Sequence, residues 1–239
     1  MPAVFVHGVP DTHRVWNPLL ASLSRKDVVT LSLPGFGSPL PEGFTPVKEQ
    51  YVDWLIAQLE AIPQPIDLVA HDWGALLAYR TLSLRPNLAR TWAAGGAPLD
   101  STYKWHAAAS RWQTPEVGER VMEATTPDAM RQGLIAAAVP ASDAAETAAH
   151  LDATMKACIL SLYRSAIHVG NEWEADLTNV PPGGLVLWGE KDPYAAAEFG
   201  ARLAHRTRAT FCSISGCGHW WQLERPREVA ALLESLWKS

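Results

Sequence analysis

Short apolar runs alternate with longer amphipathic stretches along most of the chain. Runs rich in apolar and β-branched residues predict buried strands at residues 3–6, 28–33, 66–70, 89–96, 183–189 and 208–214. Most of the stretches between them carry apolar residues at helical spacing, which predicts helices at residues 14–24, 47–62, 76–84, 195–205 and 226–237. This alternation is typical of a parallel sheet whose strands are joined by crossover helices.

The pattern changes between residues 99 and 178, where the chain is rich in alanine and helical in period. No run of strand formers interrupts this segment. A helical insert between two strands predicts a cap, or lid, over the sheet. We therefore expect a core domain formed by residues 1–98 and 179–239 and a cap domain formed by residues 99–178. The length of 239 residues, 48% of them hydrophobic, is enough for one substantial core.

Composition and charge exclude several classes of partner. The net charge of -5 and the lack of a basic cluster interleaved with aromatic residues argue against nucleic acid. No uncharged apolar stretch approaches the ~20 residues that cross a bilayer, so no membrane association is expected. Three cysteines without CxxC spacing argue against a disulfide framework and a zinc site, and no cofactor is expected. The chain start lacks the pattern of a signal peptide, so we expect a cytoplasmic enzyme.

The turn after the predicted strand at 66–70 has the pattern of a nucleophile elbow. Its sequence is HDWGA (71–75), with Asp72 at the apex. The small residues Ala70 and Gly74 stand two positions before and after the apex, as the crowding at such a turn demands. An aspartate is nucleophilic without prior deprotonation and can form an alkyl ester at saturated carbon. The alternative is that Asp72 only caps the following helix.

Two further loops supply an acid and a base in the order that hydrolase triads follow. Asp192 follows the strand at 183–189, and His219 follows the strand at 208–214. The chain order of nucleophile, acid and histidine predicts His219 as the general base and Asp192 as the residue that orients it. Glu190 and Asp100 are alternatives for the acid.

The first predicted strand ends in HGVP (7–10). Backbone N–H groups of Val9 and Trp73 are in a position to bind the oxyanion of a tetrahedral intermediate. The alternative is a tight turn in which Gly8 and Pro10 serve geometry only.

Taken together, these loops resemble the epoxide hydrolase and haloalkane dehalogenase branch of the α/β-hydrolase superfamily. The motifs that carry the resemblance are HGVP (7–10), LPGFGSP (33–39), HDWGA (71–75), WGEKDP (188–193) and GCGHWWQLERP (216–226). The resemblance implies the α/β-hydrolase fold, a mostly parallel central sheet flanked by helices, with a helical cap insert. Members usually carry a hairpin before the HG strand, which here begins at residue 3. We therefore expect the first two strands of the usual sheet to be missing and a second subunit of a homodimer to cover the edge.

The same resemblance implies proton donors on the cap, because epoxide hydrolases protonate the opening ring with cap tyrosines. Tyr163 resembles the second of these tyrosines. The only other cap tyrosine is Tyr103, which lies very early in the insert. Trp105 and His106 lie close by and are candidates to replace the first tyrosine.

Three functions remain open at this stage. The favoured one is the opening of epoxides to vicinal diols through a covalent ester on Asp72. Haloalkane or haloacid dehalogenation uses the same chemistry, with Trp73 and either Trp105 or Trp112 as candidate halide ligands. A catalytically silent ligand-binding relative is the third, whereas ordinary ester hydrolysis is disfavoured because a carboxylate nucleophile would form an anhydride. The expected reactants are a small apolar molecule and water.

Overall fold

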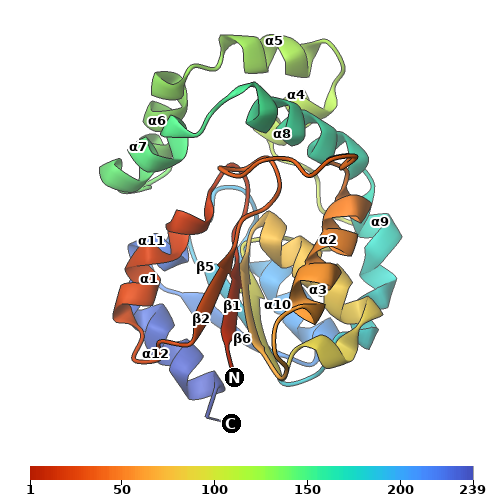
Figure 1. Ribbon diagram of the computed structural model, residues 1–239, viewed down its shortest axis with the longest axis vertical. Helices are drawn as coiled ribbons and strands as arrows, with labels where there is room; N and C mark the ends of the chain where they lie inside the picture. Colours follow the sequence, from red (N-terminus) through yellow and green to blue (C-terminus); the bar gives the residue numbers. More distant parts are fainter. Residues whose placement is uncertain (239) are drawn as a thin grey trace.

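The computed structural model describes residues 1–238 and has a six-stranded parallel sheet at its centre (Figure 1). The strands are β1 (Ala3–Val6), β2 (Val28–Leu31), β3 (Asp67–His71), β4 (Thr91–Gly95), β5 (Leu185–Gly189) and β6 (Thr210–Ile214). Their spatial order is β2-β1-β3-β4-β5-β6, and every neighbouring pair is parallel. Strands β1, β3 and β5 are buried along their whole length, which explains their continuous apolar runs. The predicted fold class is confirmed.

Helices cover both faces of the sheet and enclose a separate core on each. One face carries α1 (Asn17–Ser22), α11 (Trp221–Glu224) and α12 (Pro226–Leu236); the other carries α2 (Lys48–Glu60), α3 (Trp73–Leu84) and α10 (Ala197–Thr207). Side chains alternate between the two cores along β1, so that Val4 and Val6 join one and Ala3 and Phe5 the other.

The segment between β4 and β5 is helical, as the alanine-rich pattern predicts. It contains α4 (Ala107–Gln113), α5 (Val117–Ala124), α6 (Pro127–Ala136), α7 (Ala141–Ala149), α8 (Ala153–Ser165) and α9 (Val169–Trp173), followed by a 3-10 turn at Glu174–Asn179. Helices α4 to α8 lie across the end of the sheet at which the strands finish (Figure 1). These helices therefore cover the loops that carry the candidate catalytic residues. The division into domains at residues 98/99 and 178/179 stays a prediction.

Several element boundaries differ from the prediction for local reasons. Strand β2 ends at Leu31 rather than at residue 33, because the N–H of Leu33 donates to the ring of His7. Helix α3 begins at Trp73, directly after the elbow, and not at residue 76. A 3-10 turn (His13–Trp16) precedes α1 where one helix was predicted, and α11 was not predicted. Among residues 1–238, no helix is long and apolar enough to cross a membrane.

The sheet has β2 at one edge and β6 at the other. In the described part of the chain, no strand precedes β1. Coverage of the β2 edge by a second copy of the chain stays a prediction.

Candidate active site

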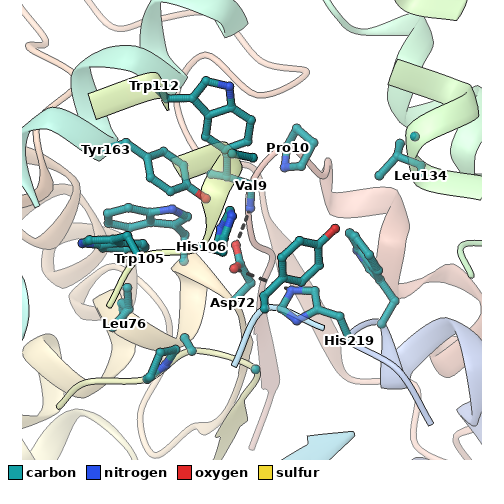
Figure 2. A pocket seen from close by; sticks show the side chains of 18 of the residues that line it. Val9, Pro10, Asp72, Leu76, Trp105, His106, Trp112, Leu134, Tyr163 and His219 are labelled. Atoms are coloured by element: carbon teal, nitrogen blue, oxygen red, sulfur yellow. Dashed lines mark hydrogen bonds and ion pairs between the residues drawn. The ribbon is translucent and has the colours of Figure 1, made fainter. Parts of the chain in front are cut away.

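Parallel strands deliver their carboxyl ends to one edge of the sheet, and the three predicted catalytic side chains meet there. Asp72 follows β3, Asp192 follows β5 and His219 follows β6. The three come together although they are far apart in the sequence. Figure 2 shows Asp72 between Val9 and His219 at the bottom of a pocket.

Asp72 occupies the strained apex of the elbow. Its φ of 52° and ψ of -126° lie in a region that non-glycine residues rarely adopt. The turn depends on glycines nearby, because a Cβ at Gly74 would lie 2.4 Å from the carbonyl oxygen of Val6, and one at Gly8 would lie 2.4 Å from Asp72 itself. The Asp72 side chain makes no capping hydrogen bond to α3. A purely capping role for Asp72 therefore has no support in the geometry.

The two carboxylate oxygens of Asp72 have different environments. Oδ1 accepts a hydrogen bond from the N–H of Val9 at 2.8 Å, whereas Oδ2 lies 3.6 Å from Nε2 of His219. Burial alone would raise the pKa of Asp72, but the hydrogen bond and charge of His219 outweigh burial and hold the pKa below its usual value. Asp72 is therefore ionised, with Oδ1 fixed by an amide and Oδ2 available for attack.

His219 lies between two carboxylates. Its Nδ1 is 2.7 Å from Oδ2 of Asp192, and the other oxygen of Asp192 accepts the N–H groups of Tyr194 (2.8 Å) and Ala195 (3.3 Å). Burial would lower the pKa of His219, but Asp192 and Asp72 together raise it to about 10. The resting site therefore holds an imidazolium between two carboxylates at neutral pH.

The alternative acids lie elsewhere. Glu190 accepts hydrogen bonds from Ser215 and the N–H of Gly216 on the surface. Asp100 is paired with Arg202 at 2.8 Å. Neither carboxylate contacts the ring of His219, so Asp192 alone is in place to orient it.

Val9 of the HGVP loop and Trp73 carry the two amides predicted for the oxyanion hole, and the role of both stays a prediction. The N–H of Val9 already points at Asp72, as its hydrogen bond to Oδ1 shows. Trp73 is the first residue of α3, where backbone N–H groups have no partner within the helix.

A cavity of about 260 Å³ opens in front of Asp72 and His219. Leu76 and Ala97 of the core line it, as do Trp105 and Trp112 of the helical insert. Among the described residues that line the cavity, Asp72 is the only Asp, Glu, Lys or Arg. The cavity therefore suits a small, uncharged and apolar molecule.

Of the two candidate cap tyrosines, Tyr163 of α8 has its hydroxyl turned toward Asp72. Its side chain is buried, and Figure 2 shows its oxygen directed toward Asp72 and Val9. Burial and the charge of Asp72 raise the pKa of Tyr163 well above its usual value, against a hydrogen bond from the Trp73 side chain. The phenol therefore stays protonated and is able to donate.

The other candidate donors differ in whether their N–H or O–H group already has a hydrogen-bond partner. The hydroxyl of Tyr103 donates to the backbone oxygen of Tyr194 at 3.1 Å and is already engaged. His106 accepts the N–H of Ala109 on Nδ1 at 3.3 Å, so its neutral ring carries the proton on Nε2. Burial lowers the pKa of His106, which favours this neutral form. Trp105 stacks on Trp73, with ring centroids 6.0 Å apart.

Three residues of the site were not singled out from the sequence. Tyr194 packs its ring 4.9 Å from both His219 and His106. Asp11 and His71 lie buried behind the catalytic loops. The signal for all three was proximity in sequence, since each is within two residues of a residue or motif named above.

The fold and the site define a hydrolase, and the chain belongs to the alpha/beta hydrolase family, whose sequence profile matches residues 3–232. One curated relative is (E)-2-((N-methylformamido)methylene)succinate hydrolase of Acinetobacter baylyi, 23% identical over 98% of this chain and 89% of the relative.

Two solved structures illustrate the shared fold. A meta-cleavage product hydrolase from Pseudomonas fluorescens has a TM-score of 0.82 at 19% identity, and the match covers 100% of this chain and 90% of the hydrolase. A haloalkane dehalogenase from Bradyrhizobium elkani has a TM-score of 0.77 at 19% identity, and the match covers 99% of this chain and 90% of the dehalogenase. At these identities the likeness concerns the fold alone.

Proposed function

We propose that this hydrolase uses Asp72 as a nucleophile and opens epoxides to vicinal diols through a covalent ester. The observation that carries the proposal is the asymmetric setting of the Asp72 carboxylate. One oxygen is bound to the Val9 amide, while the other faces His219 beside an apolar cavity. A serine-type elbow needs a base to activate its hydroxyl, whereas this carboxylate is ready to attack as it stands.

In the first step, Oδ2 of Asp72 attacks a ring carbon of the epoxide and the carbon–oxygen bond of the ring breaks. The electron pair goes to the ring oxygen, which takes the phenolic proton of Tyr163. The tyrosinate then regains a proton from the imidazolium of His219, directly or through water. The step thus leaves a neutral ester, a neutral phenol and a neutral imidazole, so the proton and charge balance.

In the second step, His219 has become a base, because esterification removed the charge of Asp72, one of the two that kept the ring protonated. The ring takes a proton from water, and the hydroxide attacks the carboxyl carbon of Asp72. Negative charge develops on Oδ1, to which the Val9 N–H already points. Collapse releases the diol and restores the carboxylate and the imidazolium.

Dehalogenation of a haloalkane is the second candidate, and one observation favours it. Trp73 and Trp105 stack at the cavity, and indole N–H groups are able to bind a halide. Haloacids fit less well, because no Lys or Arg lines the described cavity to pair with a carboxylate. The hydroxyl of Tyr163 favours the epoxide, since an alkoxide needs a proton and a halide does not.

A single turnover in oxygen-18 water tests the ester mechanism. Excess enzyme is mixed with styrene oxide, and both the peptide containing Asp72 and the diol are weighed. We expect the label in Asp72 and unlabelled oxygen in the first diol. Label in the diol alone would mean direct attack by water and would exclude the nucleophile.

If styrene oxide is not turned over, the same experiment with 1,2-dibromoethane separates the remaining functions. Release of bromide with label in Asp72 would favour the dehalogenase. Binding of both compounds without reaction would indicate a silent relative.

Tyr163 and Tyr103 offer a matched pair of variants. We expect Tyr163→Phe to slow epoxide opening by about 10²-fold or more, because the developing alkoxide loses its donor. Tyr103→Phe should change the rate less than about threefold, since that hydroxyl is bound to the Tyr194 carbonyl. The measurement is the rate of ester formation in a single turnover. Equal effects of the two changes would contradict the assignment of Tyr163.

A further inference from the structure

His71 is a buried histidine for which the proposed reaction has no use. It is the last residue of β3, directly before Asp72, and its side chain is fully buried. Its ring packs on the ring of His219, with centroids 4.6 Å apart, and its Nε2 lies 3.0 Å from the backbone oxygen of His219. A carbonyl oxygen can only accept, so Nε2 of His71 carries a proton and donates it to this bond. His71 therefore connects the end of β3 to the loop that carries the base.

The other ring nitrogen of His71 has a donor of its own. Nδ1 lies 3.1 Å from the side-chain amide nitrogen of Gln222 on α11, from which it accepts. The carboxylate of Asp11 lies 4.0 Å from Nδ1, which is beyond hydrogen-bond distance. Burial lowers the pKa of His71 to about 3, which favours the same neutral form. His71 is therefore an uncharged ring with its single proton directed at His219.

Neighbouring elements leave the ring of His71 little freedom to turn. The ring of Trp221 packs edge-on against it, with centroids 5.2 Å apart and planes at 89°. Gly96, after β4, lies beside both histidines, since a Cβ there would be 3.0 Å from Nε2 of His71 and 3.3 Å from Cε1 of His219. The packing on one side and the missing side chain on the other keep the two rings together in this orientation.

The orientation of His219 has two supports, one on its side chain and one on its backbone. Asp192 accepts from the ring at 2.7 Å, which sets the direction of Nε2 only if the backbone is itself in place. The carbonyl of His219 also accepts the N–H of Trp221 at 3.1 Å, but that bond lies within the loop, whereas the bond from His71 connects the loop to the sheet. Small displacements of a catalytic group are costly, and Nε2 of His219 is already 3.6 Å from Asp72.

We propose that His71 is a positioning residue for ester hydrolysis, whose neutral ring holds the backbone of His219 so that Nε2 of His219 faces the ester formed on Asp72. Because the ring of His71 is uncharged, it supports the base without changing the charges beside it. The role rests on the proposed ester mechanism. Ester formation needs no base, so loss of this support should slow the second step and spare the first.

Nitrogen-15 NMR of protein labelled at the histidine rings tests the neutral bridge without any substrate. Comparison with His71→Gln identifies the signals of His71. We expect a proton on Nε2 and none on Nδ1, unchanged between about pH 5 and 8. A proton on Nδ1, whether instead of the one on Nε2 or in addition to it, would overturn the proposal, because the ring would lose its donor or gain a charge.

Two variants of matched length separate the hydrogen bond from packing. The side chain introduced by His71→Gln keeps an N–H donor near the place of Nε2, whereas that of His71→Met has a similar length and no donor. In single turnovers with styrene oxide, we expect His71→Met to hydrolyse the Asp72 ester about tenfold more slowly and His71→Gln to stay within about threefold of the unmodified enzyme. Mass spectrometry of the intact protein follows both formation and decay of the ester.

The rate of ester formation is the readout that a merely structural role would move. It should change less than about threefold in either variant of His71, because Asp72 attacks without a base. Equal rates of hydrolysis in His71→Met and His71→Gln, or a loss of the same size in both steps, would overturn the proposal.

Gln222→Met removes the donor to Nδ1 without altering the elbow, so it decides the question if His71→Met does not fold. We expect ester hydrolysis to slow by about threefold or more, with formation unchanged, because the ring proton is no longer confined to Nε2. The matched control is Gln58→Met on α2, which should leave both steps unchanged. Unchanged hydrolysis in Gln222→Met would contradict the proposal. Failure of the epoxide reaction itself is distinguishable, since no ester would then form in any variant and the NMR measurement needs none.

Discussion

Replacing His219 by glutamine is expected to stop the reaction after a single alkylation of Asp72. The carboxylate needs no base in order to attack, so the ester still forms. Water then lacks the group that takes its proton, and steady turnover should fall by about 10³-fold or more. Intact-protein mass spectrometry should show one added epoxide per molecule, persisting for many turnover times of the unmodified enzyme.

The control is His205→Gln, which changes an exposed histidine of α10 and should retain full turnover without a persistent adduct. Peptide mapping should locate the adduct of His219→Gln on Asp72. A folded His219→Gln protein that turns over slowly and never accumulates an adduct would contradict the two-step scheme. It would indicate that water attacks the substrate directly.

The resting charge of His219 couples the two proposed steps, ester formation and ester hydrolysis, and the triad order alone does not imply this coupling. A histidine whose pKa is about 10 is a poor base at neutral pH. It becomes a useful base only after one of its two carboxylate neighbours is neutralised, which is what the proposed alkylation of Asp72 would do. In the proposed mechanism, the base is therefore activated by the intermediate on which it acts.

The placement of the catalytic residues was predictable because it depends on topology. Buried strands are recognised by continuous apolar runs, and parallel strands bring their carboxyl ends to one edge of the sheet. Asp72 and Asp192 each follow such a strand, and His219 follows the partly exposed edge strand β6, so their meeting required no knowledge of side-chain packing. The choice of Asp192 over Glu190 likewise followed from chain order.

The pocket was less predictable because its walls depend on how the helical insert packs on the core. The sequence favours Tyr163 and leaves the first donor open among Tyr103, Trp105 and His106, but it does not show that the Tyr103 hydroxyl donates to the backbone oxygen of Tyr194, 91 residues away along the chain. Tyr194 entered the site because the loop after Asp192 turns its ring toward His219. Local sequence patterns carry no information about the directions in which these side chains point.

The elbow itself shows where sequence periodicity fails for a physical reason. The helical period predicted residues 76–84, because the apolar spacing alone does not show how soon after the predicted elbow the helix begins. The chain passes from strand to helix through one residue, Asp72, whose positive φ allows the helix to begin at Trp73. A strained conformation of this kind contradicts local preference, and such conflicts are expected at functional positions.

Asp72→Ala and Asp72→Gly are both expected to lose turnover by about 10⁴-fold or more, because the nucleophile is gone. Their stabilities should differ. Alanine keeps a Cβ at a positive φ, whereas glycine adopts this conformation freely. We therefore expect Asp72→Gly to be about 1–2 kcal/mol more stable than Asp72→Ala in urea denaturation.

The sign of this difference is the informative part, because glycine in place of alanine normally destabilises a folded protein. Ala201→Gly, on the exposed side of α10, should show the usual loss of about 0.5–1 kcal/mol. Both comparisons exchange the same two side chains, so unfolded-state entropy contributes similarly to each. A gain at position 72 beside a loss at position 201 would measure the strain that holds the nucleophile in place. A loss at both positions would mean that the elbow stores no strain at position 72.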